Sequence, residues 1–309
     1  MSSILSIQNV SKFYGRYQAL KDISIEIPSN EIFGLLGPNG AGKTSLIRII
    51  NQITAPDSGT VFFKGEKLQP GHSARIGYLP EERGLYRKMK VGEQSIYLAR
   101  LKGLSKHDAH QKIKYWFEKF EISNWWNKRV EELSKGMQQK IQFVVTVLHE
   151  PELVILDEPF SGFDPINANL IKNEILELKR NGATIIFSTH NMGSVEELCS
   201  KIALIHHAEK ILEGSVASIK EEHKLNIYRI GFNGDRMAFA HSLWTAATIL
   251  KEEDLNGSFS ATIKLNSAVK PNDLLQALLP AVEIRSFHEI LPSMNEVFIK
   301  KVQENKSTD

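Results

Sequence analysis

The chain has 309 residues, of which 42% are hydrophobic and 24% are charged, and this length predicts about two domains. Its 38 lysines and arginines nearly balance 36 acidic residues, so the net charge does not favour nucleic acid as a main partner. The single cysteine cannot form an internal disulfide, and residues 1–15 have neither the basic head nor the apolar stretch of a signal peptide. The most apolar run, residues 141–148, is too short to cross a bilayer. These features predict a soluble, intracellular protein.

Short apolar runs alternate with helical patterns over the first two thirds of the chain. Strands that alternate with helices predict a mainly parallel sheet covered on both faces. Two further runs near the N-terminus, residues 61–64 and 75–79, are expected to be additional antiparallel strands. The buried strands are expected at residues 32–37, 153–157 and 184–188, with a helix at 42–51.

A helical block interrupts this alternation. Apolar residues recur with helical spacing over residues 92–101, 106–120 and 134–149. A block of this size between two strands predicts a helical subdomain at about residues 88–149. Trp116, Trp125 and Trp126 lie within it, and a role in the core or in a local surface cluster is favoured over partner binding.

The pattern changes after residue 214. The order of expected elements is β-α-β-β-α-β, followed by a last helix at residues 294–302, and this order is typical of a ferredoxin-like domain. The predicted division is therefore 1–220, 221–303 and a polar tail at 304–309. The strands are expected at 226–232, 248–251, 258–265 and 282–287, the helices at 235–244 and 271–279, and a hairpin turn at Asn256-Gly257.

A glycine-rich segment, GPNGAGKT at residues 37–44, matches the P-loop pattern GxxxxGK[ST] between an expected strand and an expected helix. Glycines let backbone N–H groups converge on phosphate oxygens, and a helix N-terminus adds partial positive charge. Lys43 is expected to reach the β- and γ-phosphates, and the Thr44 hydroxyl to bind Mg²⁺. The candidate nucleotide-binding residues are Gly37, Pro38, Asn39, Gly40, Ala41, Gly42, Lys43, Thr44 and Ser45.

Two carboxylates end the expected strand at residues 153–157, in the segment LVILDEP. In P-loop enzymes an acid at this position supports Mg²⁺ and a second acid acts on water, which assigns Asp157 and Glu158. His190 follows the next strand, where ligands of α/β folds collect, although a lone histidine is more often structural. Ser134 and Gly136 begin a helix, and they form either an anion site or an ordinary helix cap.

Five motifs stand in the order typical of one family. They are the P-loop, LSKGM at 133–137, LVILDEP at 153–159, SGFDP at 161–165 and STH at 188–190. Residues 4–214 therefore resemble the nucleotide-binding domain of an ATP-binding cassette (ABC) transporter. The expected fold class is an α/β P-loop cassette with an antiparallel β piece and an inserted helical subdomain, plus a small α+β ferredoxin-like domain.

The resemblance implies site roles, cofactors and partners. Tyr14 is expected to stack on adenine, Glu158 to act as general base, His190 to contact the γ-phosphate and Asp164 to communicate across a dimer. ATP and Mg²⁺ are the implied ligands. In a head-to-tail dimer with a second copy or a related subunit, Ser134 and Gly136 would close over the partner's ATP. A membrane permease is the other implied partner, which would hold the cytoplasmic chain at the inner face of the membrane, with no nucleic acid involved.

Two positions depart from the family pattern. The usual LSGGQ is LSKGM here, so that Lys135 adds a cation and Met137 lacks an amide group. Glu81 stands where the family has a glutamine, and its carboxylate is expected to bind Mg²⁺ and to alter the metal dependence.

The segments YLPEERGLY at 78–86 and LSKGMQQK resemble a bacterial branch that includes sodium, drug and lipid exporters, and the C-terminal region resembles the accessory domain of that branch. The predicted function is an ATP-hydrolysing subunit that powers a separate exporter permease. A soluble ABC ATPase acting on ribosomes or DNA, and a nucleotide sensor with little turnover, are the alternatives. The accessory domain either stabilises the subunit or regulates it.

Overall fold

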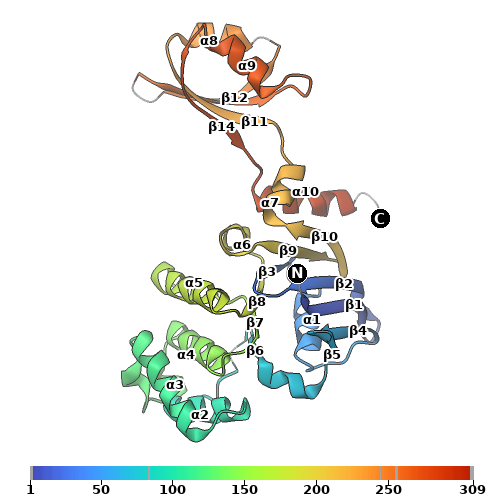
Figure 1. The fold of residues 1–309 in the computed structure, drawn as a ribbon, viewed down its shortest axis with the longest axis vertical. Helices are drawn as coiled ribbons and strands as arrows, with labels where there is room; N and C mark the ends of the chain where they lie inside the picture. Colours follow the sequence, from blue (N-terminus) through green and yellow to red (C-terminus); the bar gives the residue numbers. More distant parts are fainter. Residues whose placement is uncertain (1–2, 83, 244, 255–256, 307–309) are drawn as a thin grey trace. The chain divides into compact units, whose positions relative to one another are not determined.

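The structure, a computed structural model, describes residues 3–82, 84–243, 245–254 and 257–306 (Figure 1). It divides into two compact units, Met1–Val216 with Asn305–Asp309, and Ala217–Glu304. Each unit has a hydrophobic core of its own. Among the residues described, no helix is both long enough and apolar enough to cross a membrane.

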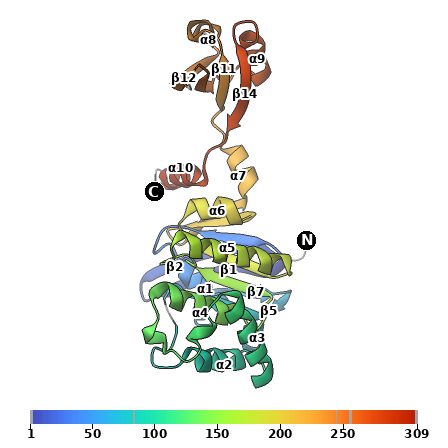
Figure 2. The ribbon, with the colours of Figure 1, turned by 90° about the vertical axis from the view of Figure 1, so that its left-hand side faces the viewer.

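A six-stranded sheet in the order β10-β9-β3-β8-β7-β6 forms the centre of the first unit. The strands from β9 to β6 run parallel, and β10 is antiparallel to β9. Every residue of β3, β7 and β8 is buried, because α4, α5 and α6 lie on one side of the sheet and α1 with β1, β2 and β4 on the other (Figures 1 and 2). The bounds are β3 Ile32–Leu36, β6 Ile76–Leu79, β7 Leu153–Asp157, β8 Thr184–Thr189, β9 Lys201–His206, β10 Glu209–Ser215, α5 Pro165–Arg180 and α6 Met192–Leu198.

The second sheet is antiparallel, in the order β2-β1-β4-β5. Helix α1 and both sheets contribute to one core, in which Ile7, Leu46, Phe63 and Ile155 are almost fully buried. The antiparallel strand predicted at residues 61–64 is present as β4. The bounds are β1 Ser3–Tyr14, β2 Tyr17–Pro28, β4 Ser58–Phe63, β5 Glu66–Lys67 and α1 Lys43–Ile50.

The prediction for residues 75–79 is wrong in direction. The strand β6 joins the six-stranded sheet and pairs in parallel with β7, starting from Ile76 opposite Leu153. Gly77 permits this position, because a Cβ atom there would lie 2.5 Å from the carbonyl oxygen of Thr146 in α4. The strand β6 therefore ends at the same edge of the sheet as Asp157, and the segment that follows β6 begins there.

The helical block folds as α2 Val91–Leu101, α3 Lys106–Lys119 and α4 Lys135–Val147. Trp126 packs against α2 at Gly92, where an added Cβ would lie 2.4 Å from the indole ring. The same ring stacks on His110 and meets Phe117 edge-on. Two of the three tryptophans of this block thus pack inside it, since Trp116 also contacts Phe120 and Phe143. Three short 3₁₀ helices lie at Pro70–Arg75, Ser123–Trp125 and Val130–Glu132.

The second unit has the predicted β-α-β-β-α-β order. Its four strands are antiparallel, in the order β12-β13-β11-β14, and α8 and α9 lie on one face of the sheet (Figures 1 and 2). Phe232 and Phe239 stack at 4.0 Å in the core. The bounds are α7 Val216–Glu222, β11 Ile227–Asn233, α8 Arg236–Leu243, β12 Ala247–Asp254, β13 Phe259–Leu265, α9 Pro271–Leu278, β14 Glu283–Ile290 and α10 Met294–Lys306; residues 244 and 256 of the predicted elements lie outside the described residues.

Cys199 is buried at the end of α6, next to Gly34 of β3. Burial raises the pKa of its thiol to about 12. The thiolate, which is the reactive form, is therefore suppressed at neutral pH.

His149 follows α4, and both nitrogens of its ring are buried. Burial, helped by the positive charges of Lys102 and Lys112, lowers the pKa of the imidazole from 6.5 to about 4. The folded chain therefore keeps His149 neutral over a pH range in which the unfolded chain protonates it.

The tight contact at Gly92 leads to a prediction about packing. We expect Gly92→Ala to lower the free energy of unfolding by about 1–3 kcal/mol, because the clash with Trp126 outweighs the better helix propensity of alanine. Urea unfolding measures the change. Gly71→Ala is the control, since a Cβ at Gly71 meets no atom within 4 Å; equal stability of the two variants would contradict the prediction.

His149 leads to a prediction about pH. We expect the folded state to lose stability as the pH falls from 6.5 to 4, because in this range the unfolded chain binds a proton that the folded chain excludes. The wild type should lose up to about 3 kcal/mol more than His149→Gln over this interval. Unfolding free energies measured at a series of pH values test this. Parallel plots of free energy against pH for the two proteins would show that the imidazole does not contribute to the pH dependence.

Candidate functional site

The P-loop connects β3 to α1 and lies tightly against neighbouring strands. Gly37 and Gly42 have φ values of 147° and 115°, which side chains rarely allow. A Cβ atom at Gly37 would lie 2.2 Å from the carbonyl oxygen of Ile205 in β9, and one at Gly42 would lie 2.3 Å from that of Ala19 in β2. The two glycines therefore let the backbone form a cradle at the N-terminus of α1, where N–H groups lack helical partners.

Lys43 begins α1 and is 6% exposed. Its Nζ donates to the carbonyl oxygens of Gly37 (2.7 Å) and Pro38 (3.1 Å). Burial lowers the pKa of this amine, and the nearby carboxylates of Glu158, Asp157 and Glu81 oppose that shift. The ammonium group therefore lies inside the loop predicted to hold phosphates.

Asp157 ends β7 and is 2% exposed. Its Oδ2 atom is buried and accepts no hydrogen bond from the residues that the structure describes. Burial raises the pKa of this carboxyl, and the negative charge of Glu81 adds to the shift. A buried carboxylate oxygen without a partner, near a second carboxylate, fits a hard cation such as Mg²⁺.

A pocket of about 370 Å³ contains these groups. No cluster of three or more His, Cys, Asp or Glu side chains suited to a metal occurs in the described part of the chain. The Thr44 hydroxyl and water would therefore have to complete a Mg²⁺ site, as is usual for this ion. The pocket is lined by Tyr17, Ala19, Asn39, Gly40, Gly42, Lys43, Thr44, Ser45, Glu81, Asp157 and Glu158.

Glu158 lies beside Asp157 with a left-handed backbone (φ 48°), a conformation that is uncommon outside functional and turn positions. Its Oε1 accepts from the His190 N–H (2.9 Å) and lies 2.6 Å from His190 Nδ1. Its Oε2 accepts from the Thr189 hydroxyl (3.0 Å). The last residue of β8, Thr189, and the residue after it, His190, thus hold both oxygens of this carboxylate in place.

Tyr14 and Tyr17 lie on the two strands of the β1–β2 hairpin, and the contact of Tyr14 with adenine stays a prediction. Tyr14 is 42% exposed, with Lys12 over its ring. Tyr17, on the other strand of the hairpin, lines the pocket, and its hydroxyl donates to the Gly40 carbonyl (2.9 Å). Ala41 is buried, and its N–H donates to Pro38 within the loop (3.2 Å). The sequence pattern contains both tyrosines, but only the folded hairpin distinguishes them.

Ser134 and Gly136 are not among the described residues that line this pocket. Ser134 caps α4 by accepting a hydrogen bond from the Met137 N–H (3.3 Å). A Cβ at Gly136 would lie 3.8 Å from the Gly162 carbonyl oxygen. Asp164 caps α5 by accepting hydrogen bonds from the backbone N–H groups of Ile166 and Asn167. These hydrogen bonds, above all the one from Asn167, lower the pKa of the Asp164 carboxyl.

A P-loop between a buried strand and a helix, two acids at the end of a nearby parallel strand and an inserted helical block define the ATP-binding cassette fold. A family model described as "ABC transporter" matches residues 20–161, and one described as "ATP-binding protein DrrA1-3-like, C-terminal domain" matches residues 214–302. The chain belongs to the ABC transporter family of ATP-binding proteins. This result confirms the resemblance and the fold class expected from the sequence.

Individual relatives agree with this assignment. The "Uncharacterized ABC transporter ATP-binding protein YhaQ" of Bacillus subtilis is 41% identical over 304 residues, covering 97% of this chain and 98% of the relative. The "Linearmycin resistance ATP-binding protein LnrL" of the same organism is 33% identical over 215 residues, covering 69% of each chain. A solved "ATP binding subunit of ABC transporter" superposes with a TM-score of 0.66 at 28% identity, covering 71% of this chain and 93% of that structure.

Glu81 leads to a prediction about the metal. We expect Glu81→Gln to raise the Mg²⁺ concentration for half-maximal ATPase activity about fivefold, because roughly 1 kcal/mol of charge attraction is lost. A Mg²⁺ titration of the ATPase rate at constant ATP measures this. Glu82→Gln is the matched control, because Glu82 does not line the pocket. An unchanged rate and an unchanged Mg²⁺ requirement would refute a role for the Glu81 carboxylate.

Proposed function

We propose that this chain binds ATP with Mg²⁺ in the pocket at the carboxyl ends of β3 and β7, hydrolyses the ATP and thereby powers a separate membrane permease. The cassette would occupy residues 1–220 and the accessory domain residues 221–303. The observation that carries the proposal is the fixed carboxylate of Glu158 beside a P-loop lysine. The Glu158 carboxylate is suited to act on water, and the Lys43 ammonium group beside it is suited to hold phosphates.

Within this proposal the P-loop amides and Lys43 bind the phosphates, and Tyr14, Tyr17 or both contact the base. Thr44, Asp157 and Glu81 would hold Mg²⁺, which supplies charge neutralisation on the phosphates when it is bound. Glu158 takes a proton from the attacking water while the oxygen of that water bonds to the γ-phosphorus and the bond to the β–γ bridging oxygen breaks. His190 and Thr189 orient Glu158. His190 has a second proposed role, which is to contact the γ-phosphate.

A head-to-tail dimer is the proposed active form. Ser134 and Gly136 begin α4 outside the pocket of their own chain, so they are available to the nucleotide of another chain. A serine hydroxyl and the N–H groups of a helix N-terminus suit a phosphate. Either a second copy or a related subunit could supply the opposite half of the site.

A permease is the proposed membrane partner, with export as the direction of transport and the inner face of the cell membrane as the location. A groove of about 390 Å³ on α2 is lined by Ile96, Tyr97 and Leu101 among others, and Tyr97 and Leu101 are 44% and 65% exposed. Exposed apolar side chains in a groove suit a protein partner. The match to an accessory domain and the resistance function in one relative's name support an exporter.

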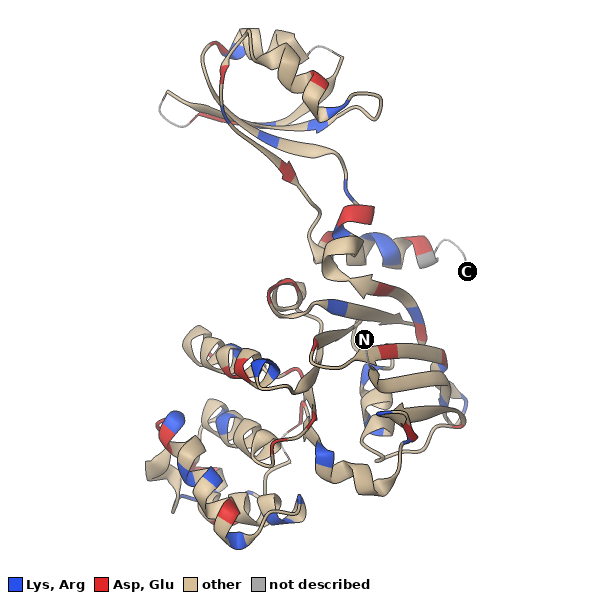
Figure 3. Cartoon of the chain, viewed as in Figure 1, with Lys and Arg blue, Asp and Glu red and all other residues tan. Residues whose placement is uncertain are grey.

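The two alternatives receive less support. Basic and acidic side chains are interspersed over both units (Figure 3), whereas a nucleic-acid or ribosome partner favours a basic face. A sensor without turnover would not need an oriented base, yet both oxygens of Glu158 are held by neighbouring groups.

The role of Glu158 leads to a prediction. We expect Glu158→Gln to lower kcat by about 100-fold or more, because the amide cannot accept the proton of the attacking water. The variant should still bind ATP, and ATP-bound dimers should accumulate. Light scattering would detect these dimers by their mass. Lys43→Ala is the contrasting variant, which should lose ATP binding itself. Hydrolysis by Glu158→Gln at the wild-type rate would refute the proposed mechanism.

A further inference from the structure

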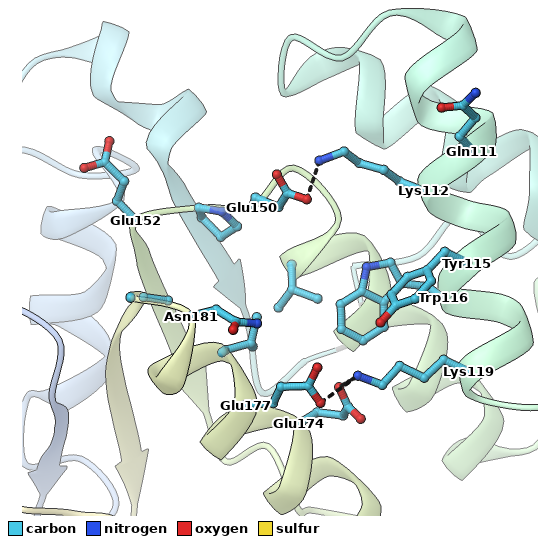
Figure 4. A pocket seen from close by; sticks show the side chains of 15 residues that line it. Gln111, Lys112, Tyr115, Trp116, Lys119, Glu150, Glu152, Glu174, Glu177 and Asn181 are labelled. Carbon is cyan, nitrogen blue, oxygen red and sulfur yellow. Dashed lines mark hydrogen bonds and ion pairs between the residues drawn. The ribbon is translucent and has the colours of Figure 1, made fainter.

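A second cleft, of about 630 Å³, lies between α3, α5 and the segment that joins α4 to β7 (Figure 4). Trp116, Val147 and Leu178 give it apolar walls, and Trp116 is backed by Phe120 and Phe143. Charged side chains from both sides meet across it. The cleft therefore separates the helical block from α5, the helix that follows the acids of β7.

Lys119, in the last turn of α3, reaches across this cleft. Its Nζ lies 2.7 Å from Glu174 Oε2 and 2.9 Å from Glu177 Oε2, on successive turns of α5 (Figure 4). It also lies 5.3 Å from the ring centroid of Trp116 and 5.9 Å from that of Tyr115. Two carboxylates and two aromatic rings thus surround one ammonium group, an arrangement that favours a cation.

The ion pair between Lys119 and Glu174 is energetically important because Glu174 is buried. The residue is 5% exposed; burial raises the pKa of its carboxyl, and Lys119 opposes the shift. For Lys119, the hydrogen bonds to the two glutamates outweigh burial and raise the pKa of the amine. Removal of Lys119 would leave a buried carboxylate without its counter-charge, which is far costlier than the loss of an exposed ion pair.

Contacts continue from this cleft toward the nucleotide pocket. The aromatic cluster of Trp116, Phe120 and Phe143 joins α3 to α4. One turn nearer the N-terminus of α4, the buried Gln139 donates to the carbonyl oxygen of Pro159, the residue after Glu158. At its N-terminus, α4 carries Ser134 and Gly136, next to the segment that leads into α5.

We propose that Lys119 is a positioning residue for ATP turnover, which fixes α3 and α4 to α5 and so holds Ser134, Gly136 and the segment after Glu158 in their working arrangement. This inference rests on the proposed function. Lys119 is not among the residues that line the nucleotide pocket, so it would act through the helices that it joins.

The test compares substitutions that remove or keep the cation. Lys119→Ala should lower kcat about tenfold while the KM for ATP stays within about twofold, because the P-loop is intact. Lys119→Arg should keep at least half of the wild-type kcat. Lys114→Ala is the control on the same helix, since Lys114 is 77% exposed and its Nζ lies 3.9 Å from Glu118.

A small cation should replace the lost side chain. In Lys119→Ala, n-propylammonium supplies the missing three carbons and the ammonium group, and it should restore most of the lost kcat; n-propanol, which has a similar size but no charge, should not. Amide hydrogen exchange gives a readout that does not depend on hydrolysis. Exchange in the last turn of α3 should speed up in Lys119→Ala and slow again with n-propylammonium.

Two results would overturn the inference: a kcat of Lys119→Ala within twofold of wild type, or a loss that neither arginine nor n-propylammonium restores. The second would mark Lys119 as a residue needed only for folding. Absence of hydrolysis in the wild type would instead refute the proposed function and, with it, the role in turnover. Hydrogen exchange would still show whether the cation joins α3 to α5.

Discussion

Parallel pairing of β3, β8, β7 and β6 is the constraint on which the rest of the molecule depends. Parallel strands end at the same edge of a sheet, so the P-loop after β3, the acids at the end of β7 and Glu81 after β6 meet there. Three segments that are separated by some 40 to 120 residues in the sequence thereby form one pocket. Helix α1 then adds the partial positive charge of its N-terminus at the same place.

The side chains of the pocket carry an excess of negative charge. Lys43 lies among the carboxylates of Glu158, Asp157 and Glu81, so negative charges outnumber the one ammonium group. Like charges held together at a buried site are unfavourable unless a cation joins them. The folding energy of the strongly apolar sheet maintains this arrangement, and a nucleotide with its metal would complement both the cradle and the acids.

The sequence predicted those features that are local in the chain. The P-loop, the acids after a run of apolar residues and the ferredoxin-like order of elements each lie within one segment, and each has a recognisable pattern. The direction of β6 was not predictable in this way, because a run of four residues carries no signal for its partner, and β7 begins more than 70 residues later. Likewise, the pairing of Lys119 with Glu174 and Glu177 depends on the packing of two distant helices. Tyr17 became distinct from Tyr14 only through the register of a hairpin.

The buried thiol of Cys199 has a practical consequence for spectroscopy. Because that thiol is both buried and protonated at neutral pH, maleimide reagents should not react with it. The natural chain can therefore serve as a background without reactive cysteines. A pair of engineered surface cysteines, one on α3 and one on α5, would then accept donor and acceptor dyes selectively. Single-molecule energy transfer could follow the distance between the two helices through a nucleotide cycle without altering any native residue of the core.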